Sequence, residues 1–184
     1  MLTVKQEGYG YLVGFILCIP LANWMIGNVG TVCVPNGPCL IPVGPNLMAP
    51  SGVLMVGLAL VLRDLVQRRL GKIWAIGAIF AGAALSGLVA PAALVVASIS
   101  AFLLSELADF AVYTPLQRKR LILAVVASST VGLVIDSVLF LYLAFGSLDF
   151  VSGQIVGKAW MVVLALPFIW WMRMRDSRLE LQPA

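Results

Sequence analysis

The chain contains no histidine among its 184 residues. Catalytic triads with a histidine base, histidine proton relays and histidine metal ligands are therefore excluded. The chain also lacks the Gly-x-x-x-x-Gly-Lys-Ser/Thr loop that cradles phosphates in many nucleotide hydrolases. We therefore expect neither a metal nor a nucleotide cofactor.

Charged residues are scarce as well. They make up 11% of the chain, whereas 61% is hydrophobic. Soluble globular domains have roughly 45–50% apolar and about 25% charged residues. This composition excludes an ordinary soluble domain and indicates one integral membrane domain in contact with the lipid bilayer. The few basic residues lie in short clusters beside apolar runs, which is a signal of membrane topology, so no nucleic-acid partner is expected.

Apolar runs of bilayer length occur six times along the chain. They cover residues 9–27, 48–65, 73–90, 92–114, 121–145 and 151–172. Proline or glycine separates several of them, such as Pro91 between the third and the fourth and Pro115 after the fourth. In lipid, each span has to satisfy its own backbone hydrogen bonds. We therefore predict an all-α integral membrane protein with six transmembrane helices.

Lysine and arginine are absent from every second connection between these spans. Residues 28–47 and the third and fifth connections contain none, whereas the second connection, the fourth and the C-terminal tail carry clusters of them. Positive residues are retained on the cytoplasmic side of a membrane. We therefore predict that both termini are cytoplasmic, in a bacterial inner (plasma) membrane, and that residues 28–47 lie outside.

The cysteines give a further expectation about this external connection. Cys33 and Cys39 flank a Pro-Asn-Gly-Pro sequence, which favours a turn that brings them together. An oxidising compartment permits a disulfide between them, and two free thiols are the alternative. The third cysteine, Cys18, is expected to pack between helices.

Four charged residues lie well inside the predicted spans, away from their ends: Glu106, Asp109, Asp136 and Lys158. Such residues cost roughly 2.5–3.5 kcal/mol each on insertion scales, so they usually face the bundle interior and serve function. Helical periodicity places Glu106 and Asp109 on one stripe of the fourth span. We predict that these charges line one cavity of net negative charge.

Each charge also has a structural interpretation. Glu106 or Asp109 pairs with Lys158 and joins two helices, or Asp109 reaches an arginine of the fourth connection at the membrane surface. Lys158 alternatively extends to the external surface. The adjacent Arg63 and Asp64 are interpreted as an ion pair at the cytoplasmic interface.

Three blocks of sequence resemble one transporter family. The blocks are Leu62-Arg-Asp-Leu-Val-Gln-Arg-Arg-Leu-Gly71, Ser105-Glu-Leu-Ala-Asp-Phe-Ala-Val-Tyr113, and Ser128-Ser129 followed by Ile135-Asp-Ser-Val-Leu-Phe140. In order and spacing they resemble the queuosine-precursor transporters of the vitamin uptake transporter (VUT) family, YhhQ type. The resemblance implies six transmembrane helices, similar to the substrate-binding component of energy-coupling-factor transporters but without an ATPase module. It also implies uptake of a deazapurine such as cyano-deazaguanine for tRNA modification.

A deazapurine ligand suggests a role for each candidate residue. Glu106 first, and Asp136 second, would accept the two parallel donors of a guanine-like edge, and Asp109 is a further acid candidate. Asn23 and Gln154 would bind the carbonyl and ring nitrogens, and Lys158 a carbonyl or a nitrile. The aromatic residues that would stack on the ring are Phe102, Tyr113, Phe140 and Trp24.

Two other functions fit the same residues. One is a solute-binding membrane component that needs an energising partner. The other is an intramembrane enzyme that pairs Asp136 with Asp109 or Glu106. The sequence leaves open whether a proton or a sodium ion drives uptake, and whether small residues of the third span form a homodimer.

Overall fold

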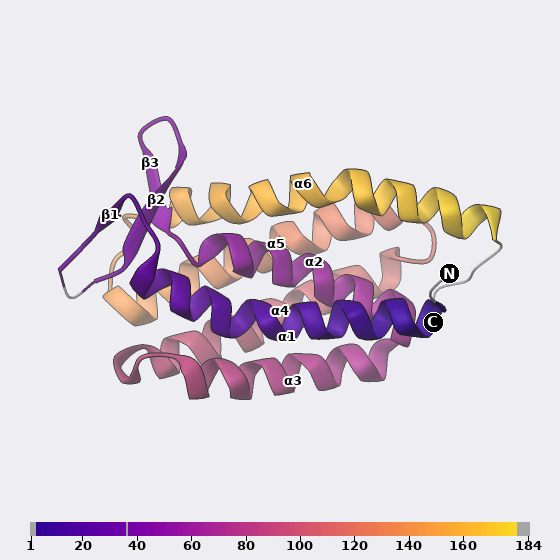
Figure 1. Cartoon of the computed structure of the whole chain (residues 1–184), viewed down its shortest axis with the longest axis horizontal. Helices are drawn as coiled ribbons and strands as arrows, with labels where there is room; N and C mark the ends of the chain where they lie inside the picture. Colours follow the sequence, from indigo (N-terminus) through magenta and orange to yellow (C-terminus); the bar gives the residue numbers. More distant parts are fainter. Residues whose placement is uncertain (1–2, 36, 180–184) are drawn as a thin grey trace.

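The computed structural model describes residues 3–35 and 37–179, and this part of the chain forms six long helices with a small sheet at one end (Figure 1). The helices are α1 (Val4–Asn28), α2 (Val53–Leu70), α3 (Lys72–Val89), α4 (Val95–Leu116), α5 (Leu121–Phe145) and α6 (Val151–Arg178). A short 3-10 helix, η1 (Ala92–Leu94), precedes α4. Six helices are thus confirmed, and five of them, all but α2, are long and apolar enough to cross a membrane. Helix α2 begins five residues later than expected because residues 48–50 belong to a strand.

Local sequence signals explain several helix ends. At the start of α1, the Thr3 hydroxyl accepts a hydrogen bond from the Gln6 amide, and the Gln6 side chain accepts one from the Thr3 amide, which is a capping box. Gly146 ends α5 with a left-handed backbone at φ 64°. Gly71 joins α2 to α3 at φ 93°, a conformation that favours glycine.

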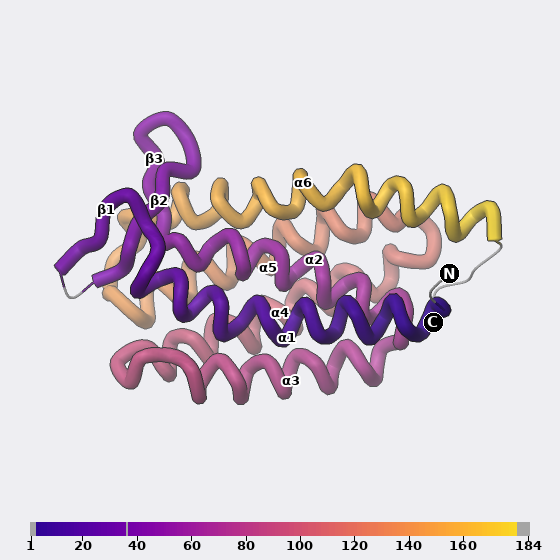
Figure 2. Tube along the Cα trace, in the orientation of Figure 1, coloured from indigo at the N-terminus to yellow at the C-terminus, as the bar shows by residue number. Residues whose placement is uncertain are grey.

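Helix α2 occupies the centre of the bundle. It packs against all five other long helices, and the tube view places it between α1 and α6 (Figure 2). The other five helices are long and apolar enough to cross a membrane, whereas α2 carries several charged residues. A helix surrounded by protein can bury charges because neighbouring side chains pair with them. The central position of α2 therefore explains its unusual composition.

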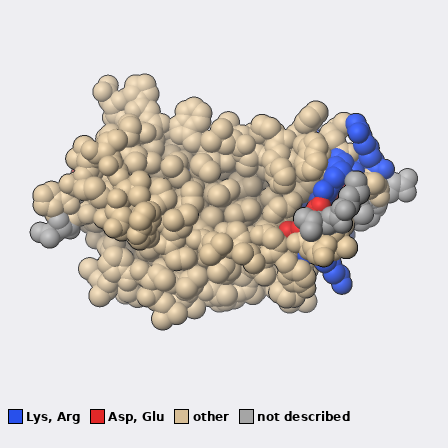
Figure 3. Space-filling view, in the orientation of Figure 1, with Lys and Arg blue, Asp and Glu red and all other residues tan. Residues whose placement is uncertain are grey.

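The lateral surface of the bundle is apolar. Leu17, Val96 and Leu164 are among many large hydrophobic side chains that are exposed there. Figure 3 shows lysine, arginine and acidic side chains gathered at the end where α1 begins and α6 ends, while the rest of this face carries none. An apolar belt with charges at one end is the surface expected of a bundle embedded in lipid.

The opposite end of the bundle carries an antiparallel sheet, so the all-α prediction is wrong for this connection. Its strands are β1 (Val32–Cys33), β2 (Cys39–Gly44) and β3 (Leu47–Pro50), in the order β1-β2-β3. Most of the segment lies between the first and second apolar spans, where its length and turn residues allow hairpins to pair their backbones. These strands have only 2, 6 and 4 residues, too few for a clear alternation of polar and apolar side chains.

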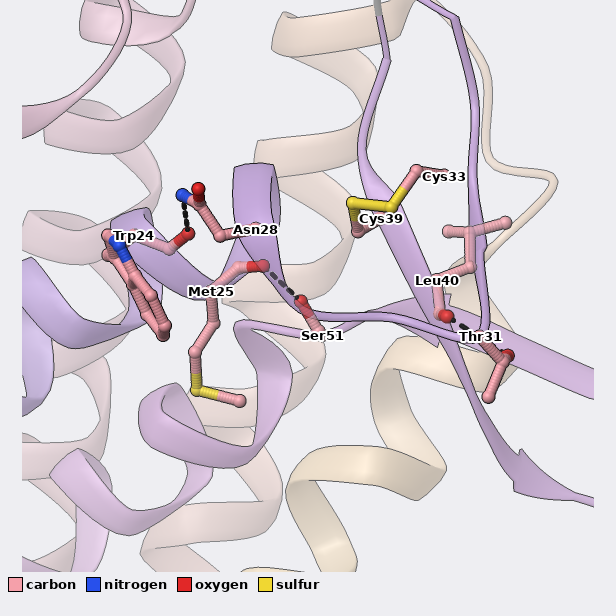
Figure 4. Close-up of a disulfide and its surroundings, with 8 residues drawn as sticks. All are labelled: Trp24, Met25, Asn28, Thr31, Cys33, Cys39, Leu40 and Ser51. Carbon is pink, nitrogen blue, oxygen red and sulfur yellow. Dashed lines mark hydrogen bonds between the residues drawn. A yellow bond between two sulfur atoms is a disulfide. The ribbon is translucent and has the colours of Figure 1, made fainter.

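A disulfide links the first two strands (Figure 4). Cys33 and Cys39 are directly paired in the sheet, with their Cα atoms 3.9 Å apart. The predicted bridge is therefore confirmed. Nearby, the Ser51 hydroxyl donates to the Met25 carbonyl at 2.7 Å and holds the start of α2 against the end of α1. Cys18 is free, buried and packed in a hydrophobic cluster with Phe15, as expected of a packing residue.

Close contact between α2 and α6 depends on a glycine. A Cβ atom at Gly57 would lie 2.6 Å from the carbonyl oxygen of Lys158 and 2.8 Å from its Cα. Gly57→Ala is therefore expected to destabilise the protein by roughly 1–3 kcal/mol, the usual cost of overpacking. The control is Gly77→Ala, because a Cβ there meets nothing within 4 Å. Thermal unfolding of both variants in detergent checks this, and equal melting temperatures would contradict it.

Candidate functional site

A cavity lies between the helix ends on the sheet side of the bundle. All six long helices contribute to its walls. A deeper hollow shares Asn23, Phe102 and Asp136 with it and also includes Glu106. Because the two hollows share walls, we describe them together as the central cavity. The predicted site residues that line it are Asn23, Phe102, Glu106, Asp136, Phe140, Gln154 and Lys158.

A buried lysine organises the outer part of the central cavity. The ammonium of Lys158 donates to Asp136 Oδ2 at 2.6 Å, to Ser137 Oγ at 2.8 Å and to Gln154 Oε1 at 2.8 Å. These three bonds match its three N–H donors. Lys158 is 1% exposed, so the expectation that it extends to the external surface is wrong. Its partner also lies on α5 and not on α4, because α6 packs against α5 at this depth.

A second charged group lies deeper, around the central helix. The guanidinium of Arg63 donates through Nε to Glu106 Oε2 at 3.1 Å and through Nη2 to Asp109 Oδ1. The same Nη2 atom lies 2.9 Å from Asp64 Oδ1. Nη1 donates to Gln67 Oε1 at 3.2 Å. We call Arg63, Asp64, Glu106 and Asp109 the arginine cluster.

The burial of the arginine cluster corrects two expectations. Arg63 and Asp64 are 0% exposed, so they do not form an ion pair at the membrane interface. Asp109 is also 0% exposed, and its partner is Arg63 and not an arginine of the fourth connection. The reason is that α2 lies at the centre of the bundle and faces the acidic stripe of α4. An arginine that directly follows the apolar run 53–62 was the signal available for this cluster.

Three predicted site residues do not line the central cavity. Asp109 belongs to the arginine cluster, on the side away from the cavity. Tyr113 is fully buried, with its ring 5.7 Å from the Arg63 guanidinium, an arrangement typical of a cation–π contact. Trp24 is 55% exposed on the outside of α1. Helical spacing alone does not show how deep in the bundle such a residue lies or which neighbouring helix it faces.

The amides of the central cavity have defined orientations. Asn23 donates through Nδ2 to the Ile19 carbonyl at 3.0 Å, which leaves its oxygen as a free acceptor. Gln154 uses its oxygen to bind Lys158, which leaves its amide nitrogen as a free donor. Phe102 packs its ring 6.0 Å from that of Phe15 and lines both parts of the cavity. The cavity thus combines a carboxylate, an acceptor, a donor and an aromatic wall, which suits a flat polar ligand.

Ion pairs join the helices at the opposite end of the bundle. Asp176 of α6 accepts hydrogen bonds from Arg68 Nη2 at 2.9 Å and from Arg69 Nη2 at 2.8 Å, both on α2. Arg175 donates to both carboxylate oxygens of Glu7 on α1, at 2.5 and 2.7 Å. These pairs hold α1, α2 and α6 together at the end away from the sheet, where neither part of the central cavity reaches.

Comparison with known proteins identifies a family that matches part of the chain. The model of a family described as "Putative vitamin uptake transporter" matches residues 88–172, which run from the end of α3 into α6. This stretch contains Glu106, Asp109, Asp136 and Lys158. No curated protein and no solved structure matches the chain. The family match and the five apolar helices support a multi-pass membrane transporter and favour it over an enzyme.

Proposed function

We propose that the protein imports a deazapurine precursor of queuosine, such as cyano-deazaguanine, across a bacterial inner membrane without an ATPase module. The observation that supports this most is the central cavity inside an apolar bundle, where Gln154 lines the outer part, Glu106 the deeper part and Phe102 both. Its aromatic wall and its hydrogen-bonding side chains suit a flat heterocycle. The match to a vitamin uptake transporter family agrees with a small heterocyclic substrate.

The Glu106 carboxylate is suited to a guanine-like edge. Such an edge presents a ring N–H beside an exocyclic amine, two parallel donors that one carboxylate accepts together. A carboxylate has about four acceptor positions, and Arg63 uses one of those on Glu106. The free amide nitrogen of Gln154 donates to the ligand carbonyl or nitrile, while the free oxygen of Asn23 accepts from a ring N–H. Phe102 stacks on the ring.

The distribution of charge supports an orientation for this transporter. The arginine-rich end, where α1 begins and α6 ends, is the cytoplasmic end by the positive-inside rule. The central cavity and the disulfide-linked strands then lie towards the outside, which agrees with an oxidising compartment. In this orientation the cavity receives the substrate from outside, and the ion pairs of Glu7, Arg175 and Asp176 close the cytoplasmic end.

Uptake of radiolabelled cyano-deazaguanine by proteoliposomes that contain only this protein tests the proposal. We expect uptake that unlabelled deazaguanines suppress and that a vitamin does not. Binding without uptake would instead support a solute-binding component that needs an energising partner. Absence of both binding and uptake, in protein shown to be folded by thermal unfolding, would contradict the proposed substrate.

Replacement of Glu106 by glutamine tests the ligand contact. The amide offers one acceptor oxygen in place of two and removes a charge, so we expect affinity for cyano-deazaguanine to fall by about 10- to 100-fold, as for the loss of a hydrogen bond to a charged group. Asp149→Asn is the control, because Asp149 is an exposed acid in the loop between α5 and α6. Equilibrium binding to both variants gives the answer, and unchanged affinity in Glu106→Gln would refute the contact.

A further inference from the structure

We propose that the arginine cluster is a proton-binding site in the membrane interior and that its proton couples uptake to a pH gradient. The first part concerns the cluster itself. The second part rests on the transport function proposed above, so the two parts need separate measurements.

The charges of the arginine cluster do not balance. One guanidinium is surrounded by the carboxyl groups of Asp64, Glu106 and Asp109, and none of the four side chains is more than 3% exposed. With all three acids ionised, the cluster would carry a net charge of about −2 inside the bundle. Removing a charge from water costs several kcal/mol even after the protein relaxes. A proton bound to one acid removes half of the excess charge.

One carboxyl oxygen of the cluster has no partner and indicates where the proton binds. Within the described residues, Asp109 Oδ2 is buried and lacks a hydrogen-bond partner, while Asp64 Oδ1 has only its charge contact with Arg63 at 2.9 Å. Both carboxyl groups approach the same nitrogen, Nη2 of Arg63, so they are neighbours. A proton on one of them can form a hydrogen bond to the other. Two neighbouring carboxyl groups share one proton, because the repulsion between two negative charges makes it costly to ionise both.

Among the described residues, Arg63 is the one cation that forms an ion pair with the acids of the cluster. From α5, the Ser128 hydroxyl donates to Asp64 Oδ2 at 3.0 Å. Gly132 of the same helix lies beside Asp109 and has no side chain to contact it. From α4, the neighbour is the phenol of Tyr113. Two other buried cations of the bundle have acidic partners of their own: Lys158 pairs with Asp136, and Arg68 pairs with Asp176.

The geometry favours a proton over a metal ion. Among the described residues, no three acidic or cysteine side chains lie close enough together to hold a metal. The guanidinium of Arg63 contacts all three acids of the cluster and occupies the position that a cation would take. A sodium-driven mechanism would therefore need a different site.

Glu106 connects the proton site to the central cavity. Its carboxylate lines the deeper part of the cavity and also accepts a hydrogen bond from Arg63. A proton from the cavity side therefore reaches the cluster through Glu106. A ligand that binds Glu106 is separated from Arg63 by this one side chain. Arg63 in turn contacts Asp64 and Asp109. Binding of the substrate and of the proton are thereby linked through one arginine.

Infrared spectroscopy of the purified protein tests the proton site without any substrate. We expect a carbonyl band of a protonated carboxyl group that disappears as pH is raised and that is lost or shifted in Asp109→Asn. Asp64→Asn is the second variant, in case the first does not fold, and Asp149→Asn is the control that keeps the band. A spectrum without such a band, or a band unchanged in both cluster variants, would overturn the proposal.

Transport by proteoliposomes tests the coupling. With the outside one pH unit more acidic, one proton per substrate supports about tenfold accumulation of cyano-deazaguanine, and a protonophore should abolish it. Asp109→Asn should still exchange labelled for unlabelled substrate but no longer respond to the gradient. Accumulation driven by sodium, or exchange with no accumulation in either gradient, would overturn proton coupling. Loss of exchange in the wild type would instead refute the proposed substrate, and the infrared result would still decide the proton site.

Discussion

Replacement of Arg63 by methionine is expected to produce the largest loss of stability in this protein. Arg63 is fully buried and is the guanidinium that holds Asp64, Glu106 and Asp109. Removing one partner of a buried ion pair typically costs about 3–5 kcal/mol, because the remaining charge is left uncompensated. For a chain of this size, that corresponds to a fall in melting temperature of roughly 6–20 °C.

The matched control is the same substitution at Arg118, which is exposed in the connection between α4 and α5. Exposed substitutions usually change stability by less than about 0.5 kcal/mol, so Arg118→Met should melt within about 2 °C of the wild type. Adding Asp109→Asn to Arg63→Met should recover part of the loss, since one uncompensated carboxylate is removed. Equal melting temperatures for Arg63→Met and Arg118→Met would show that the arginine cluster does not stabilise the fold.

Replacement of Lys158 by methionine is expected to have the second largest effect, on both stability and ligand binding. Its ammonium makes three hydrogen bonds while 1% exposed, and its loss would leave Asp136 buried beside Gln154 with no cation. We expect a loss of about 3–5 kcal/mol for the same reason as above. Lys119→Met, at an exposed position, is the control.

A double variant separates the structural role of this pair from its role in binding. Lys158→Met combined with Asp136→Asn removes both charges and should regain most of the melting temperature. Cyano-deazaguanine affinity should stay at least tenfold below that of the wild type, because Gln154 loses the bond that orients its amide towards the ligand. If affinity returned together with stability, the pair would only join α5 to α6 and would have no part in the site.

The candidate site shows how far sequence reasoning reaches. Glu106, Asp136, Gln154 and Lys158 were found because polar residues in apolar spans are costly and stand out, and all four line the central cavity. Arg63 and Asp64 stand out equally, but counting residues along α2 places them close to the membrane surface. Their burial follows from the five helices that surround α2, which no local pattern records.

The aromatic candidates illustrate the same limit. Phe102 and Phe140 line the central cavity, whereas Tyr113 is buried beside Arg63 and Trp24 is exposed on the outside of α1. Periodicity shows which residues share one face of a helix. It does not show which other helix that face meets, or how deep in the bundle a given residue lies.

By itself, the sequence determined the number and positions of the six helices, the clustering of positive charge at one end and the intramembrane acids. These features depend on local physical chemistry, because in lipid each apolar segment of sufficient length has to satisfy its own backbone as a helix. Only the tertiary structure decided that Arg63 pairs with Glu106 and Asp109, and that Lys158 pairs with Asp136. The choice of partner depends on which helices pack together and in what rotation, and contacts between distant segments set that arrangement.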